Sequence, residues 1–244
     1  MFAESLPIFA ATILGALAFL SGGVLSHKLS HFIAHHSGPV IAFASGAMLA
    51  VTFAHVLPES IAMGGEYAFL AVFAGVVFFF ILEHFLYLHS CPDSSHEDCE
   101  NHTLGPLAAL GMGIHSFFDG VIIVFSFMAD PTLGWLITLG IILHKLPAGG
   151  ILHTLICHNQ KNGKFWWIFA VAATTPLAAV LLPLLRNVSE SQIGIGLAFS
   201  AGTLLYITLS DLLPETHRSR TKFNLVFLFL GILLIFGINQ LFPG

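Results

Sequence analysis

The chain has 244 residues, of which 56% are hydrophobic and only 9% are charged. A soluble domain carries roughly 25% charged residues, so this composition indicates a protein that crosses a membrane several times. The net charge of −5 provides no basic surface for nucleic acid, and the three cysteines exclude a framework of disulfides.

Apolar stretches separated by polar residues, glycine or proline predict eight membrane-spanning helices in a single domain of residues 1–244. We therefore expect an all-α membrane protein. No basic segment precedes the first stretch, so we expect it to remain in the protein rather than to be removed as a signal peptide. The predicted spans are 6–26, 39–57, 64–88, 104–128, 132–156, 164–185, 192–213 and 223–241.

The basic residues lie almost entirely on one side of these eight spans. Lys145 is within the fifth span, and only Arg186 falls on the opposite side. Because loops rich in Lys and Arg stay in the cytoplasm, both termini are predicted to be extracytoplasmic, in a plasma (inner) membrane or an organelle membrane. The six residues that set this orientation are Lys28, Lys161, Lys164, Arg218, Arg220 and Lys222.

One loop, residues 89–103 between the third and fourth spans, is strongly hydrophilic. Its predicted side is the cytoplasm, a reducing compartment, so we expect its two cysteines to be thiols. Their spacing matches no compact zinc knuckle. We interpret the loop as a segment that binds metal ions loosely and exchanges them. The alternative is a loop that is only solvated. The capture residues would be His89, Cys91, His96, Cys99 and His102.

Two polar motifs interrupt the apolar fourth and fifth spans: HSFFDG at 115–120 and HKLPAG at 144–149. Ionisable groups at this depth are costly and mark ion or substrate pathways. His115 and Asp119 share one helical face, and His144 is at similar depth on the next span. These ligands suit Zn²⁺, Fe²⁺ or Mn²⁺ better than Ca²⁺ or Mg²⁺. The alternative is that each His is a packed residue bonded to a neighbouring backbone.

This pattern predicts a transporter whose cargo is a divalent metal ion, with no permanent cofactor. Three protein ligands leave a position for water, which suits an ion that must be released. Lys145 is the most unusual residue, because a bare ammonium in hydrocarbon is costly. We expect it to face the polar centre and pair with Asp119, compensating its charge. Snorkelling of the lysine toward water is the alternative.

Residues 42–60 and 198–216 form an internal repeat. The two segments are offset by 156 positions, and 8 of 19 residues are identical without a gap. They lie in the second and seventh spans, which run in opposite directions across the membrane. The sequence therefore predicts an inverted repeat of spans 1–3 and 6–8 around a central pair, a 3+2+3 arrangement that is common in secondary transporters. Chance similarity between apolar helices is the alternative.

His55 and Asp211 occupy matching positions in this repeat. Each precedes a Leu-Pro-Glu sequence that supplies a further carboxylate, Glu59 or Glu215. We interpret these four residues as entry and exit groups of a transport pathway, and we place Ser116 on the same pathway. The alternative is that they are polar groups near helix ends that meet water.

The HxxxDG and HKxPxG motifs, together with the Leu-Pro-Glu endings, resemble the ZIP family of zinc and iron transporters. The resemblance covers the whole chain. It implies metal ligation by His115, Asp119 and His144, and transport toward the cytoplasm. It further implies a homodimer, and an elevator-like movement of spans 1, 4, 5 and 6 against a scaffold of spans 2, 3, 7 and 8.

The chain departs from this family pattern at Ala148, Lys145 and Thr175, where many members place ligands for a second metal. The resemblance therefore implies a mononuclear site here, with Lys145 in place of a second ion. Two other functions are considered. An intramembrane metalloprotease requires a His-Glu-x-x-His helix, which the sequence lacks. A membrane metal sensor would bind the same ions without transporting them, so it differs from a transporter only in lacking metal flux.

Overall fold

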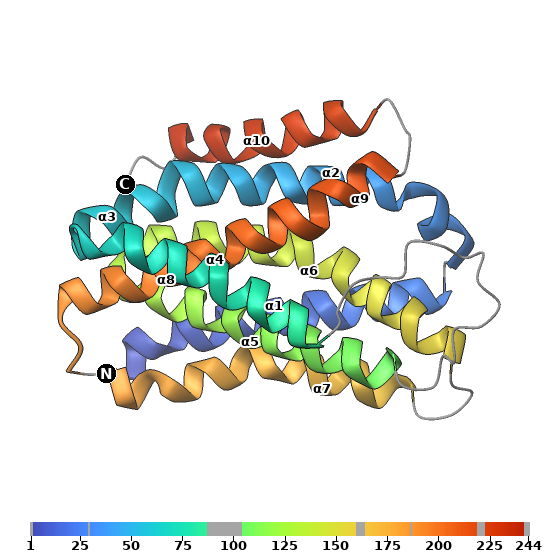
Figure 1. Ribbon diagram of the computed structural model, residues 1–244, viewed down its shortest axis with the longest axis horizontal. Coiled ribbons are helices and arrows are strands. Elements are labelled where there is room, and N and C mark those ends of the chain that lie inside the picture. Colours follow the sequence, from blue (N-terminus) through green and yellow to red (C-terminus); the bar gives the residue numbers. More distant parts are fainter. Residues whose placement is uncertain are drawn as a thin grey trace.

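A computed structural model shows an all-helical fold over the residues that it describes, 2–28, 30–86, 104–159, 164–185, 187–218 and 223–241 (Figure 1). Within these ranges, seven helices are long and apolar enough to cross a membrane, and a shorter apolar helix covers Asn224–Ile238. The α-helices are α1 (Phe2–Lys28), α2 (Ser30–Val51), α3 (Leu57–Gly64), α4 (Tyr67–Leu86), α5 (Leu104–Ala129), α6 (Pro131–Asn159), α7 (Lys164–Leu177), α8 (Glu190–Ile207), α9 (Leu213–Arg218) and α10 (Asn224–Leu241).

Three short elements continue these helices. A 3₁₀ helix, η2 (Ala178–Leu185), extends α7 just after Pro176. Two π-helical turns, η1 (Thr52–Val56) and η3 (Thr208–Leu212), join α2 to α3 and α8 to α9. The two turns lie at the same offset of 156 residues as the repeated sequence.

The predicted end of the second span, at residue 57, was too early, because the apolar span runs to Gly64, whereas the seventh span ends at Leu212, close to the predicted 213. The helices continue through Pro58 to Gly64, and through Pro214 to Arg218. In each case the residue before the proline donates its N–H five residues back, Leu57 to Thr52 and Leu213 to Thr208. A π turn widens the helix where the proline ring would meet the preceding carbonyl, so the chain passes the proline without stopping.

The chain after α3 turns at Gly65, whose φ of 61° is in the left-handed region that favours glycine. The Gly65 N–H donates to the Ile61 carbonyl at 3.0 Å. α4 therefore starts at Tyr67 rather than at 64, and it returns to the opposite end of the molecule (Figure 1). The start of α1 and the end of α10 lie at the same end.

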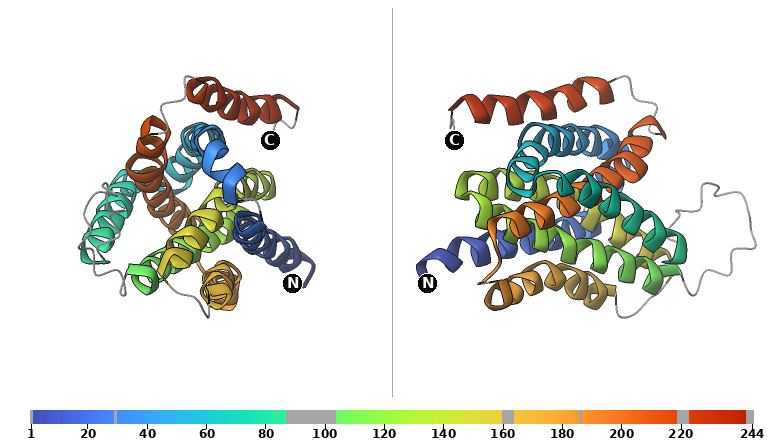
Figure 2. Two further views of the ribbon diagram at one scale, coloured as in Figure 1. Left: turned by 90° about the vertical axis from the view of Figure 1, so that its right-hand side faces the viewer. Right: turned by 60° about the vertical axis from the view of Figure 1, so that its left-hand side comes forward.

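The helices form two groups, which are visible in the end-on view of Figure 2. We call α1, α5, α6 and α7 the four-helix bundle, because they pack chiefly against one another. We call α2, α4, α8 and α10 the outer layer, in which α2 pairs with α10 and α4 pairs with α8. The two groups meet mainly where α5 contacts α8 and α2 contacts α6.

Glycines bring the backbones of each outer-layer pair into close contact. A Cβ on any of four glycines would lie 2.0–2.1 Å from a carbonyl oxygen of the facing helix. Each contact in one pair has a counterpart in the other pair at a distance of 156 positions in the sequence. The contacts are Gly46 with Leu228 and Gly231 with Phe43 in α2–α10, and Gly202 with Val72 and Gly75 with Phe199 in α4–α8.

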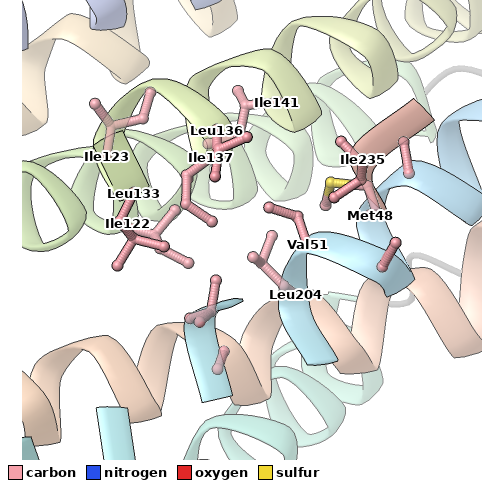
Figure 3. Packing of buried hydrophobic residues seen from close by; sticks show 14 of the residues in the cluster. Met48, Val51, Ile122, Ile123, Leu133, Leu136, Ile137, Ile141, Leu204 and Ile235 are labelled. Carbon is pink, nitrogen blue, oxygen red and sulfur yellow. The ribbon is translucent and has the colours of Figure 1, made fainter. Parts of the chain in front are cut away.

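An apolar cluster fills part of the space between the two groups (Figure 3). We call it the apolar plug. It lies toward the end where α5 connects to α6, on the same side as the start of α1 (Figure 1). Its most buried members include Met48 and Val51 of α2, Ile122 and Ile123 of α5, Ile137 and Ile141 of α6, and Leu197 and Leu204 of α8.

We expect Gly231→Ala to destabilise the protein, because the new Cβ would lie 2.1 Å from the Phe43 carbonyl oxygen and would force α10 away from α2. Overpacking of this kind costs about 1–3 kcal/mol. The thermal midpoint of the purified protein in detergent measures the effect. Gly237→Ala, on the same helix with no atom within 4 Å, is the control. Equal midpoints for the two variants would contradict the close α2–α10 contact.

Candidate functional site

The sharp connection between α5 and α6 aligns their polar motifs. Asp130 separates the two helices, and its Oδ1 accepts a hydrogen bond from the Leu133 N–H at 2.9 Å. Pro131 occupies the first position of α6, where its missing N–H costs nothing. The helices return antiparallel, so residues 115–119 of α5 and 144–145 of α6 come to the same depth.

His115, Asp119 and His144 converge there, and their ligand atoms all lie within 4.8 Å of one another. Asp119 Oδ2 is 3.4 Å from His115 Nε2 and 3.4 Å from His144 Nε2. Atoms bound at about 2.05 Å to a tetrahedral zinc ion lie about 3.3 Å apart, so the spacing fits a metal ion. Asp119 and His144 are 2% and 1% exposed, whereas His115 retains 14%.

The orientation of His144 is set by its own helix. Its Nδ1 lies 3.2 Å from the Gly140 carbonyl oxygen, one turn earlier. A carbonyl only accepts, so this hydrogen bond places a ring proton on Nδ1 and leaves Nε2, which faces Asp119 Oδ2, as the nitrogen available to a metal ion. Metal-binding histidines are commonly held in this way by a second partner.

Lys145 lies in the interior of the four-helix bundle, where its ammonium reaches the same Asp119 oxygen that the two histidines face. Its Nζ lies 2.9 Å from Asp119 Oδ2, donates to Ser116 Oγ at 2.9 Å, and sits 5.6 Å from the centre of the Phe19 ring. The side chain is only 1% exposed, so snorkelling is excluded. A buried ammonium requires such compensation from a carboxylate and a hydroxyl.

Thr175 and Ala148, which the sequence analysis singled out, lie on the same side of the bundle as this lysine. Thr175 is fully buried, and a Cβ on Gly15 of α1 would lie 3.5 Å from Thr175 Cγ2 and 3.8 Å from Lys145 Cδ. Ala148 is partly buried and packs against the apolar cluster that contains Phe19. The lysine stem thus occupies the interior of the bundle beside the threonine.

Among the predicted pathway residues whose side chains the structure describes, His55, Glu59 and Asp211 do not join the central group, whereas Ser116 does. His55 and Glu59 are partly exposed, and Asp211 is exposed and accepts a hydrogen bond from Ser210 at 3.1 Å. Ser116 is buried against Lys145. The Glu215 side chain lies outside the described residues, as does the whole predicted capture loop with His89, Cys91, His96, Cys99 and His102.

One neighbour of the site was missed by sequence reasoning. Phe79 of α4 makes a T-shaped contact with the His115 ring, with ring centres 6.3 Å apart. The chain has 24 phenylalanines, and nothing in the local sequence distinguishes this one. Only the packing of α4 against α5 reveals the contact.

Membrane-spanning helices around a buried group of two imidazoles and a carboxylate define a class of membrane proteins that handle metal ions. Comparisons with known proteins agree. The sequence model of the ZIP zinc transporter family matches residues 87–239, more than half of the chain. The chain therefore belongs to the ZIP family of zinc transporters, which supports metal-ion transport rather than enzymatic activity.

Individual relatives extend the similarity over nearly the whole chain. An uncharacterized protein of Methanocaldococcus jannaschii is 27% identical over 94% of this chain and 94% of its own length. The zinc transporter ZupT of Chlorobium luteolum is 28% identical, covering 86% of this chain and 88% of its own. The zinc transporter ZIP13 of Pongo abelii is 28% identical, covering 75% and 59%.

We expect Lys145→Met to destabilise the metal-free protein by about 3–5 kcal/mol, because it leaves the Asp119 carboxylate buried without its ammonium. The double variant Lys145→Met/Asp119→Asn removes both charges and should recover much of this loss. Thermal unfolding in metal-free detergent buffer measures both, with Lys28→Met at the end of α1 as a control. A double variant no more stable than the single one would contradict the pairing.

Proposed function

We propose that this protein transports a divalent transition metal ion toward the cytoplasm. Zn²⁺ is the first candidate, followed by Fe²⁺, Mn²⁺ and Cd²⁺. His115, Asp119 and His144 are the proposed ligands. The observation that carries the proposal is the convergence of their ligand atoms within 4.8 Å, deep in two membrane-spanning helices. Imidazole and carboxylate ligands favour this group of ions.

The ligand set suits transient binding. Three protein ligands leave at least one position for water, so the ion keeps a route for ligand exchange. His115 is the most exposed of the three at 14%, which marks the side from which water reaches the site. A closed shell of four protein ligands, as in structural zinc sites, would hold the ion too firmly for transport.

We propose that the site holds a single metal ion. A second dication nearby would need additional carboxylates to offset the repulsion between the ions. Ala148 and Thr175 provide none, and the Lys145 ammonium already lies 2.9 Å from Asp119 Oδ2. In the metal-free protein Lys145 offsets the charge of Asp119. An incoming ion would compete with it for that oxygen.

Alternating access by an elevator-like movement is the proposed mechanism, with the four-helix bundle moving against the outer layer. The apolar plug supports this proposal, because it separates the site from the end at which α5 meets α6. An ion cannot pass through packed Met, Val, Leu and Ile side chains. Passage from that end therefore requires α5 and α6 to shift relative to α2 and α8.

We further propose that the fold is an inverted repeat in the 3+2+3 arrangement. The paired glycine contacts and the two π turns, all related by 156 positions, support it. α2 and α8 run in opposite directions in Figure 1, as such a repeat requires. His55 and Asp211 lie in the two π turns, and with Glu59 and Glu215 they remain our proposed entry and exit groups.

The remaining proposals follow from loop charge and family resemblance. We place both termini outside the cytoplasm, and the loop of residues 89–103 inside it as a site of loose metal capture. A homodimer that joins the outer layers of two copies would provide a fixed scaffold for the moving bundle. Ser116, as the partner of Lys145, would act on the pathway through that lysine.

Substituting Ala for His115, Asp119 or His144 should abolish most zinc uptake into proteoliposomes. The same variants should lose the single zinc ion per chain that we expect equilibrium dialysis to detect in the unmodified protein. Each substitution removes one of three ligands, and monodisperse elution would establish that the variant is folded. Near-normal uptake by both His115→Ala and Asp119→Ala would contradict the site.

The same preparations distinguish the alternative functions. Cleavage of a membrane substrate without zinc flux would favour a protease. Zinc binding without zinc flux would favour a sensor.

Cysteine labelling tests the orientation. Asn187→Cys, in an exposed turn before α8, should react with a membrane-impermeant maleimide in intact cells. Cys91 should react only after permeabilisation, because loops rich in basic residues stay in the cytoplasm. The reverse pattern would place the termini in the cytoplasm.

A further inference from the structure

The two histidines of the proposed metal site are held in different ways. His144 Nδ1 is hydrogen-bonded to the Gly140 carbonyl oxygen of its own helix. His115 Nδ1 is buried and has no hydrogen-bond partner among the residues that the structure describes. A hydrogen bond therefore fixes the His144 ring, whereas the His115 ring, which meets Asp119 through Nε2 and the His144 ring at 5.5 Å, depends on packing at its Nδ1 side.

Phe79 supplies that packing. Its ring is nearly perpendicular to the His115 imidazole, at 86°, with the ring centres 6.3 Å apart. Phe79 is only 5% exposed, so its own position is closely constrained. Perpendicular aromatic contacts have a preferred geometry, and they stabilise one orientation of each ring.

Other aromatic rings hold Phe79 in place. It makes T-shaped contacts with Phe118 of α5 at 5.5 Å and with its neighbour Phe78 at 5.7 Å. Phe78 and Phe118 both contact Phe199 of α8, at 5.6 and 5.9 Å. This aromatic cluster joins α4, α5 and α8 beside His115, where α4 and α5 otherwise touch little.

We propose that Phe79 is a positioning residue for His115, an inference that rests on the proposed metal site. Its ring holds the imidazole in the orientation that directs Nε2 toward Asp119 Oδ2. Phe79 belongs to the outer layer and His115 to the four-helix bundle. A displacement of the bundle therefore removes the ring that orients one of the ligands. Movement between the groups lowers metal affinity, and ion release is coupled to it.

The experiment compares zinc affinity and zinc K-edge X-ray absorption for the full-length protein in detergent. Phe79→Leu keeps apolar bulk but removes the ring, and it should weaken zinc binding about fivefold, the range expected for one aromatic contact. In its X-ray absorption spectrum, the number of imidazoles bound to zinc should fall from two to about one. Phe79→Tyr keeps the ring and should restore both. Phe78→Leu is the control, because it removes a more exposed ring of the same cluster for which the described residues show no ring contact with His115.

Each outcome decides the proposal. Unchanged affinity and two imidazoles in Phe79→Leu would overturn it, and so would an equal loss in Phe78→Leu, which would indicate general packing. Phe79→Met provides a second test with the same criteria if the leucine variant does not elute as a monodisperse peak. His115→Ala separates this proposal from the function on which it rests. If that variant keeps the unmodified affinity and imidazole count, the proposed metal site itself is wrong.

Discussion

The burial of the Asp119 carboxylate within a membrane-spanning helix is the constraint on which the site depends. A carboxylate at 2% exposure is tolerated only when cations or hydrogen-bond donors surround it. One oxygen, Oδ2, meets Lys145 at 2.9 Å and both histidines at 3.4 Å. The charge of Asp119 on α5 is thus balanced by the Lys145 ammonium of α6, and these two helices cannot separate without exposing it.

A contrast in packing suggests where the molecule can move. Within the outer layer, glycines bring backbone against backbone, as at Gly46 with Leu228 and Gly202 with Val72. The same holds in the bundle, where a Cβ on Gly149 would lie 2.0 Å from the Phe19 carbonyl. Between the two groups, the apolar plug and Phe79 meet through side chains. Side chains change rotamer more readily than backbones separate, so the contact between the groups is the one that the proposed movement would break.

The sequence predicted the helical class, the approximate spans and the three residues that converge, because apolar length and i, i+4 spacing are local properties. It ended the second span too early, since a proline was taken as a stop and the π turn that accommodates Pro58 leaves no simple sequence signal. The Lys145 ammonium lies beside Asp119, as the sequence predicted. The contact of that lysine with Phe19 and the contact of Phe79 with His115 depend on which helices become neighbours. No pattern within one helix contains that information.

The two copies of the repeat agree where the fold needs them to agree. Gly46 and Gly202 occupy equivalent close contacts, and Thr52 and Thr208 each bond the carbonyl four residues back, at 2.8 and 2.7 Å, where a π turn begins. The copies differ inside those same turns, at His55 and Asp211. The π turn that both copies share thus carries the His55 imidazole toward one end of the molecule and the Asp211 carboxylate toward the other. A neutral ligand and an anionic ligand hold a dication with different strength, so symmetric backbones give the proposed pathway chemically unequal ends.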